Sequence, residues 1–366
     1  MPPELFNPTR LSLARRRRGL TKTALAQAVG VTTRTVIGYE KGEYEPTPEM
    51  LATISSELEF PPAFFFGPTL EEPPIDGVSF RAMSRLTAKL SDQARAAGTL
   101  AIALSDWIHA RFKLREPSVP CYEGLDPESA AEAVRSEWEL GEKRITNVIH
   151  LLEWHGVRVY SLSEETVQMD AFSFWRGDLP YVFLNTMKSG ERSRMDAAHE
   201  LGHLVMHSRG GAHGRQAENE ARRFAAAFLM PKGSVTAHAP YGGSLPQLIE
   251  AKKRWNVSVA SLAVRMHEPH IRMLNDWQYR NIFIEIGRNG YRTKEPDESQ
   301  GETSQVLGKV FANLRDEGMS MAQVAQKLAL WPQELSRLIF GLILTPILGT
   351  GTTGKSSPPP TLRLVR

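Results

Sequence analysis

The chain has 366 residues, of which 41 % are hydrophobic, and it carries a net charge of +3. This length and composition predict two or three domains, each with its own core. There is no run of eighteen apolar residues and no start resembling a signal peptide, so we expect a soluble, cytoplasmic protein without a membrane partner. The single cysteine, Cys121, excludes an intrachain disulfide and a thiolate zinc site.

Positive charge is concentrated near the N-terminus. No Asp or Glu lies between Leu5 and Tyr39, and the basic residues of this stretch are Arg10, Arg15, Arg16, Arg17, Arg18, Lys22 and Arg34. A basic cluster on a folded surface is typical of proteins that bind a polyanion. The alternative is a solvated basic helix without a partner.

Four short helices are predicted in residues 1–70, at about residues 9–17, 23–29, 32–39 and 48–58. Gly19, Gly30 and Gly42 separate or end them, because glycine accepts the left-handed backbone of a helix end. The apolar residues are spaced as in a helix-turn-helix core, namely Leu25, Ala26, Val29, Val31 and Val36. This pattern predicts an all-α bundle.

The same stretch resembles the Xre-type helix-turn-helix of phage-repressor-like regulators. The resemblance rests on Arg18-Gly19-Leu20-Thr21, on Leu25-Ala26 followed by Val29-Gly30-Val31-Thr32, and on Tyr39-Glu40-Lys41-Gly42. It implies that the third helix enters the major groove of a double-stranded operator, and that the protein binds a palindromic site as a homodimer. The implied base contacts are Thr32, Thr33, Arg34 and Thr35, and the implied phosphate contacts are Lys22 and Lys41.

The middle of the chain begins with a linker predicted at residues 71–80. A long helix is expected at residues 86–112, which either bridges the two halves of the chain, pairs two subunits, or packs inside the second domain, as its apolar spacing favours. Helices are predicted at residues 126–138 and 146–155, and strands at residues 157–160, 171–175 and 181–184. A strand of this small sheet is expected to hold an extended peptide by edge pairing.

A His-Glu-x-x-His pattern follows the strands, inside an apolar helical run. At ~100° per residue, His199 and His203 lie on one helical face and reach one metal ion, with Glu200 beside them as a general base. The alternative is two chance histidines on a buried helix. A third ligand is expected from the next helix, which stops at Pro231, and the candidates there are Glu218, which is better aligned with the apolar stripe, and Glu220.

These residues resemble the ImmA/IrrE family of zinc metallopeptidase-like domains. Besides His199 to His203, the resemblance rests on the run from Glu218 to Pro231, on Arg192, Arg194 and His207, and on Trp255 with Val257-Ser258. It implies that Zn²⁺ is bound by His199, His203 and Glu218, that Glu200 is the catalytic base, and that the substrate is a repressor or antitoxin protein cleaved during a stress response. No chemical role is expected for Arg192 or His207, which we interpret as structural.

The last third is predicted to contain helices at residues 245–255 and 259–267 and a short strand at residues 282–286. A linker is expected at residues 293–305, a helical unit at residues 306–342, and a disordered tail at residues 343–366. The helical unit has helix-turn-helix spacing but no dense basic face, so we expect a helical cap or a protein contact there and not a second DNA reader.

The sequence thus predicts a multidomain, mainly α protein. An N-terminal all-α helix-turn-helix bundle is followed by a central zincin-like α+β domain with a small sheet, at residues 81–292, and by the C-terminal helical unit. We expect a DNA-binding transcription regulator whose zinc domain cleaves a partner protein. The alternative is a non-enzymatic regulator or antitoxin whose zinc domain binds a partner protein or a small signal.

Overall fold

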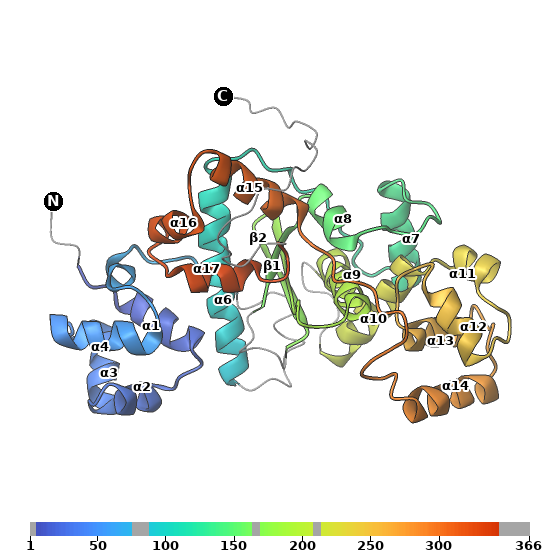
Figure 1. Ribbon diagram of the computed structural model, residues 1–366, viewed down its shortest axis with the longest axis horizontal. Helices are drawn as coiled ribbons and strands as arrows, with labels where there is room; N and C mark the ends of the chain where they lie inside the picture. The colour runs from blue at the N-terminus through green and yellow to red at the C-terminus, as the bar shows by residue number, and fades with distance from the viewer. Residues whose placement is uncertain (1–4, 75–87, 163–168, 208–213, 344–366) are drawn as a thin grey trace, which may run out of the picture.

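The computed structural model describes residues 5–74, 88–162, 169–207 and 214–343. In Figure 1 the N-terminal helices lie at one end of the molecule, the sheet and the long helix α6 lie at its centre, and α11 to α14 lie at the other end. The predicted fold class is confirmed, since the chain is mostly helical with one small sheet. Of the predicted tail at residues 343–366 only residue 343 is described, and most of the predicted linker at residues 71–80 lies outside the described residues.

The N-terminal domain is built from short, capped helices. They are α1 (Pro8–Arg17), α2 (Lys22–Ala28), α3 (Thr33–Lys41), α4 (Pro48–Leu58) and the 3-10 helix η1 (Pro62–Phe66). Threonine hydroxyls at Thr21, Thr32 and Thr47 accept hydrogen bonds from the first turns of α2, α3 and α4, which fixes where each helix begins. Phe64 and Phe65 of η1 are fully buried and close the core beneath α1 and α4.

A three-stranded sheet forms the centre of the second domain. Its strands are β1 (Arg158–Ser161), β2 (Ala171–Arg176) and β3 (Leu179–Leu184), in the order β1-β3-β2. β1 is parallel to β3 and β2 is antiparallel to it, so β2 lies at an edge. Phe172 and Phe183 stack face to face at 4.4 Å between ring centroids, and this cross-strand pair strengthens the register.

Helix α6 (Ala88–His109) stands between the two domains (Figure 1). Its N-terminal half packs against α1, while Gly98 lies close to Phe174 of the sheet. The helix therefore bridges the halves and also packs inside the second domain. Because more than half of its residues are buried within the chain, it offers little surface for pairing two subunits.

The remaining helices of the second domain begin beside the sheet and continue to the far end of the molecule. They are α7 (Pro127–Glu137), α8 (Val148–Trp154), α9 (Gly190–Met206), α10 (Arg215–Leu229), α11 (Lys232–His238), α12 (Leu245–Lys252), α13 (Val259–His267) and α14 (Asp276–Arg288). The prediction of a strand at residues 282–286 is wrong, because this segment belongs to α14. Asn275 and Gln278 form a capping box that starts a helix, and Ile282 and Ile286 are buried one turn apart.

The C-terminal unit consists of α15 (Gln305–Asp316), α16 (Met321–Lys327) and α17 (Pro332–Ile339). At the start of this unit, two carboxylates cap each other's helices: Glu153 of α8 caps α15, and Glu302 before α15 caps α8. Glu153 of α8 accepts from the backbone N–H of Gln305 at 2.9 Å, and Glu302 accepts from the backbone N–H of Val148 at 2.6 Å. The end of the predicted linker at residues 293–305 is therefore packed against the second domain.

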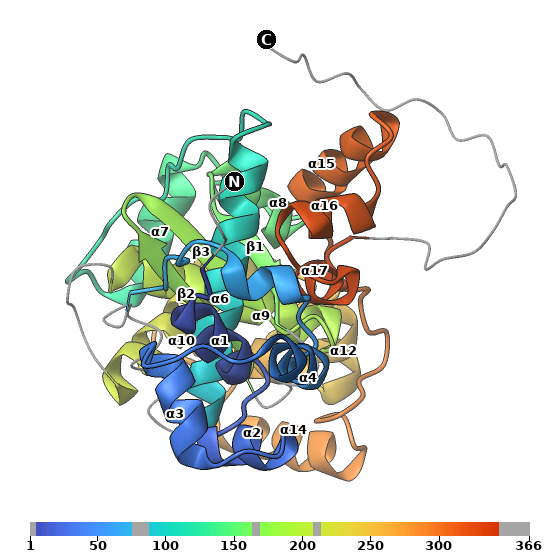
Figure 2. The ribbon, with the colours of Figure 1, turned by 90° about the vertical axis from the view of Figure 1, so that its left-hand side faces the viewer.

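Helix α17 lies between the N-terminal domain and the sheet (Figures 1 and 2). It contacts β1 on one side, and its Glu334 pairs with Arg17 and Arg18 of the N-terminal domain on the other. Within the ranges that the structure describes, no helix has the length and apolar character needed to cross a membrane.

Candidate metal centre and DNA-reading helix

Helices α9 and α10 approach each other closely at Gly202. A Cβ atom at this position would lie 3.0 Å from Phe224 Cδ1 and 3.2 Å from Ala221 Cα, so a side chain there would push α10 away. The close approach is what brings the first turn of α10, with Glu218, beside the histidines of α9.

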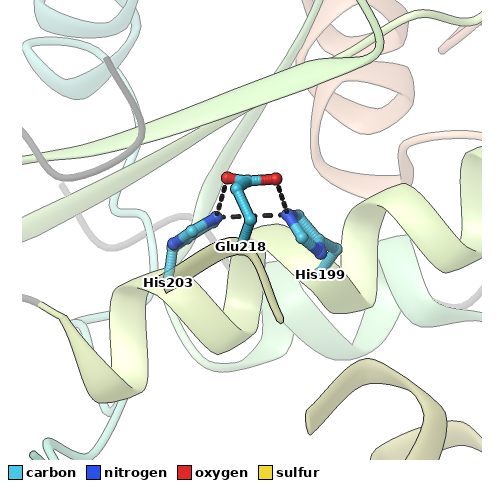
Figure 3. A group of neighbouring side chains, drawn as sticks. All are labelled: His199, His203 and Glu218. Atoms are coloured by element: carbon cyan, nitrogen blue, oxygen red, sulfur yellow. Dashed lines mark hydrogen bonds and ion pairs between the residues drawn. The ribbon is translucent and has the colours of Figure 1, made fainter. Parts of the chain in front are cut away.

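Three donor atoms meet between the two helices. His203 Nε2 lies 3.1 Å from His199 Nε2 and 3.1 Å from Glu218 Oε1, and His199 Nε2 lies 3.5 Å from Glu218 Oε2. In Figure 3 both imidazoles rise from α9 and the Glu218 carboxylate lies across them. Ligands held ~2.0–2.1 Å from one tetrahedral zinc ion are about 3.3 Å apart, so this donor set fits zinc with one position left for water or substrate.

Burial and charge set the protonation of the three side chains. Burial lowers the pKa of His203 to about 4, so its imidazole is neutral at pH 7, the form that binds a metal. Burial would also lower the pKa of His199, but the hydrogen bond to Glu218 and the carboxylate of Glu200 raise it. Against its own burial, hydrogen bonds with His199 and His203 hold the pKa of Glu218 well below its usual range. The carboxylate is therefore ionised.

Glu200 lies next to His199 on α9 and touches the sheet. Its side chain accepts a hydrogen bond of 2.6 Å from Ser173 Oγ of β2, and only 3 % of the residue is exposed. Burial raises the pKa of Glu200 to about 7. A general base works best when its pKa lies near the working pH, so this carboxyl is suited to accept and return a proton.

The second carboxylate of α10 has a different partner. Glu220 Oε2 lies 3.0 Å from His207 Nε2, and His207 Nδ1 lies 3.1 Å from His203 Nδ1. If His203 binds a metal through Nε2, its Nδ1 carries the proton and donates to His207, whose own proton is then on Nε2 and faces Glu220. These two hydrogen bonds orient the imidazole of His203, which is the usual function of groups that contact a metal ligand from outside the metal site.

The sequence left Glu218 and Glu220 open as third ligands, and the structure brings only Glu218 to the two histidines. His207 had a recognisable signal, since it continues the four-residue spacing of His199 and His203. No sequence signal pointed to Ser173, because its contact with Glu200 depends on the packing of β2 against α9.

The two predicted arginines lie apart from the donor set. Buried Arg194 pairs with Glu302 and donates to the carbonyl of Ile145, and Arg192 donates to the carbonyl of Arg292. Both tie α9 to neighbouring segments, in agreement with a structural role.

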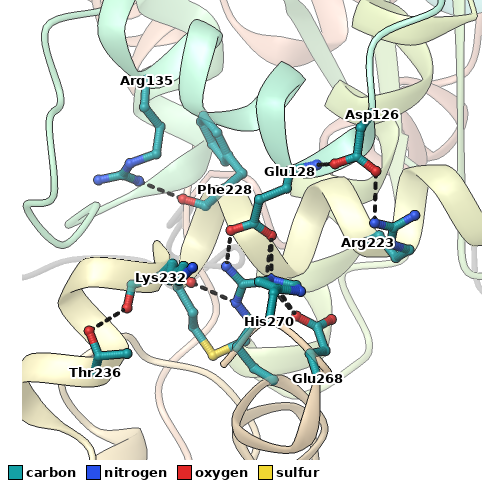
Figure 4. A network of polar contacts seen from close by, with 11 residues as sticks. Asp126, Glu128, Arg135, Arg223, Phe228, Lys232, Thr236, Glu268 and His270 are labelled. Atoms are coloured by element: carbon teal, nitrogen blue, oxygen red, sulfur yellow. Dashed lines mark hydrogen bonds and ion pairs between the residues drawn. The ribbon is translucent and has the colours of Figure 1, made fainter. Parts of the chain in front are cut away.

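A second group of acidic and histidine side chains lies between α7 and α13 (Figure 4). Glu128, Glu268 and His270 bring their ligand atoms within 4.8 Å of one another. However, the guanidinium of Arg265 already lies among them, with Nη2 2.5 Å from Glu128 Oε1 and Nη1 2.5 Å from Glu268 Oε2. This cluster is therefore an ion-pair network around the buried Arg265 that joins two helices.

Four of the six predicted DNA contacts lie at the start of α3. Arg34 is exposed, Thr32 caps the helix by accepting from Thr35 N at 3.2 Å, and Thr33 and Thr35 are partly exposed on the first turn. Lys22 begins α2 and lies 3.3 Å from Glu40, and Lys41 ends α3 and lies 3.7 Å from Glu43. The arrangement leaves the N-terminal turn of α3 accessible.

The prediction that the arginines of α1 face a polyanion is wrong. Arg15 pairs with Glu40 at 2.6 Å, Arg16 pairs with Glu72, and Arg17 pairs with Glu334 at 2.6 Å. Arg18 also pairs with Glu334, and the guanidinium of Arg10 lies over the ring of Phe64. These side chains hold the domain together and attach it to the rest of the chain.

Comparison with known proteins agrees with both motifs. Residues 11–65 match the helix-turn-helix family, and residues 152–267 match a peptidase family described as IrrE N-terminal-like domain. No curated protein matches the chain. The first turn of α3 falls inside the first segment and the donor set falls inside the second. The chain therefore joins a segment that matches the helix-turn-helix family to a segment that matches the IrrE N-terminal-like family, the fusion that its motifs predict.

Proposed function

We propose that this chain is a transcription regulator whose metal domain is a zinc-dependent endopeptidase that cleaves a partner protein, a repressor or an antitoxin. The observation that carries the proposal is the convergence of His199, His203 and Glu218 beside a buried Glu200. The boundaries at residues 1–70, 81–292 and 306–342, a cytoplasmic location and a role in stress response belong to the same proposal.

His199, His203 and Glu218 would hold a zinc ion, which would supply Lewis-acid chemistry at a peptide carbonyl. Glu200 would accept a proton from the water molecule that attacks the carbonyl and would return it to the leaving amine. Ser173 holds the Glu200 carboxylate from behind, and His207 holds the ring of His203. The side chains of His199 and Glu218 are 18 % and 30 % exposed, so substrate approaches from their side.

Strand β2 runs beside the proposed base, because its Ser173 donates a hydrogen bond to Glu200. That a strand of this sheet holds an extended peptide by edge pairing stays a prediction.

Glu200→Gln separates a peptidase from a binding module. The amide keeps the size of the side chain but accepts no proton, so zinc content should stay at about one ion per chain while cleavage of a partner repressor is lost. The measurement pairs metal analysis with a cleavage assay on repressors encoded nearby, and His203→Ala is the control that loses both. If Glu200→Gln regulates normally in cells and His203→Ala does not, the metal domain binds a partner or signal and is not a peptidase.

A further inference from the structure

Residues 305–341 repeat the helix-turn-helix of the N-terminal domain at one constant shift in numbering. Helix α2 (Lys22–Ala28) corresponds to α16 (Met321–Lys327) from first residue to last, and each follows a hydroxyl cap, Thr21 or Ser320. At the same shift α1 and α15 end at corresponding residues, and α3 and α17 begin at corresponding residues.

The turns repeat as well as the helices. The backbone is left-handed at Gly19 and Gly318, at Gly30 and Ala329, and at Gly42 and Gly341. The hydrogen bonds that close the turns also recur in pairs, Leu20 N to Arg15 O with Met319 N to Leu314 O, and Val31 N to Ala26 O with Leu330 N to Ala325 O. Matching left-handed residues in matching turns specify the same chain path.

The two copies share a core but not a recognition surface. Buried apolar residues correspond in the second and third helices, as in Leu25 with Val324, Ala26 with Ala325, Val36 with Leu335, and Tyr39 with Leu338. At the start of the third helix, however, Thr32, Thr33, Arg34 and Thr35 correspond to Trp331, Pro332, Gln333 and Glu334. The second set has no cation and adds a carboxylate, which a DNA phosphate would repel.

Glu334 instead contacts arginines of the first copy. Glu334 Oε1 lies 2.6 Å from Arg17 Nε and Glu334 Oε2 lies 2.8 Å from Arg18 Nη1, while the side chains of Arg17 and Glu334 are 0 % and 1 % exposed. Arg337, one turn further along α17, pairs with Glu334 and with Glu59 at the end of α4. The ion pair between Arg17 and Glu334 is buried. Removing one member of such a pair is destabilising, because the charge of the other member stays buried without a partner.

We propose that residues 305–341 are a second helix-turn-helix whose recognition surface binds protein, and that its partner is the arginine pair at the end of α1 in the first helix-turn-helix. The opposite end of this unit is fixed to the metal domain by the cap exchange between Glu153 and Glu302. The C-terminal unit is thus a clamp that joins the DNA-binding domain to the metal domain.

The test compares Glu334→Gln with Glu317→Gln in the full-length chain. Glu317 is an exposed carboxylate of the same unit, so Glu317→Gln makes the same chemical change as Glu334→Gln at a position away from the interface. We expect Glu334→Gln to speed amide hydrogen exchange in the second half of α1 and in α17 by about tenfold or more, without changing α9 or α10. Exchange unchanged from the parent chain, or the same acceleration in Glu317→Gln, would overturn the clamp.

Two further variants keep the result interpretable. Glu334→Asp retains the charge with a shorter reach and should restore most of the protection, whereas equal loss in both variants would mean that the ion pair does not hold the interface. Gln333→Ala tests for DNA reading by α17. We expect it to leave the base preference of the full-length protein unchanged, and an altered preference would show that α17 reads DNA and would overturn the proposal.

Discussion

Two carboxylates on the same turn of α10 have different tasks in the metal site. Glu218 faces both imidazoles, and Glu220 holds His207 behind His203. Glu220→Gln should therefore weaken zinc binding about tenfold, as for other groups behind a metal ligand, and Glu218→Gln should weaken it much more. Competition with a chromogenic chelator measures both affinities. Equal losses, or the reverse order, would mean that Glu220 is the ligand.

Arg34 is the exposed side chain best placed to select a base. Arginine donates two hydrogen bonds to guanine, so Arg34→Ala should cost ~1–3 kcal/mol of binding free energy and relax the preference at one position of the operator. Lys22→Ala is the matched control, because loss of a phosphate contact weakens binding equally on all sequences. Binding to a set of single-base operator variants distinguishes the two outcomes.

His155 makes the stability of the second domain sensitive to acid. Its ring stacks on Trp138 at 3.8 Å between centroids, and burial, with the nearby Arg115, lowers the pKa of His155 to about 4. An unfolded histidine titrates near ~6.5, so the unfolded state takes up the proton first as pH falls. The stability from neutral His155 is complete above that pH and is lost between about 6.5 and 4. The melting temperature of His155→Gln should fall less than that of the parent over this range, and parallel curves would refute the assignment.

At the scale of elements, the internal pairing of α1 changes what salt should do to DNA binding. The predicted DNA contacts Lys22, Arg34 and Lys41 have exposed cationic side chains, whereas those of Arg15, Arg16 and Arg17 are paired with carboxylates and at most 14 % exposed. The slope of log affinity against log salt should thus be about −3 per copy, and four further phosphate contacts, from Arg15 to Arg18, would make it about −6. A titration of the full-length protein on its operator measures it, and the steeper slope would mean that the α1 ion pairs open on DNA.

Elements with local signals were predictable. Glycine turns predict the N-terminal helices to within a few residues, and the four-residue spacing places His199 and His203 on one helical face. Contacts between residues far apart in the chain were not predictable, because no local pattern pairs Arg17 with Glu334 or Ser173 with Glu200. The error at α14 has a different origin, since a short apolar run fits either a strand or a helix, and the signal that favours a helix is the capping box of Asn275 and Gln278.

At the scale of the whole molecule, DNA binding calls for two copies. One helix-turn-helix contacts few base pairs, and a two-fold axis doubles the number that are read. We therefore expect a homodimer on a palindromic operator, with an interface outside α6, whose surface is largely covered within the chain. Light scattering of the protein with and without operator DNA measures this, and a monomer in both samples would contradict it.

The ion pair between Arg17 and Glu334 also has a consequence for biosynthesis. The two residues are 317 positions apart in the chain. At about 5–20 residues per second, a ribosome makes Arg17 on the order of tens of seconds before its carboxylate partner exists. During that interval the N-terminal domain has its helices and its core but no attachment at α17. A nascent or truncated chain that stops before residue 334 therefore carries an untethered DNA-binding domain, and its attachment to the metal domain is among the last steps of folding.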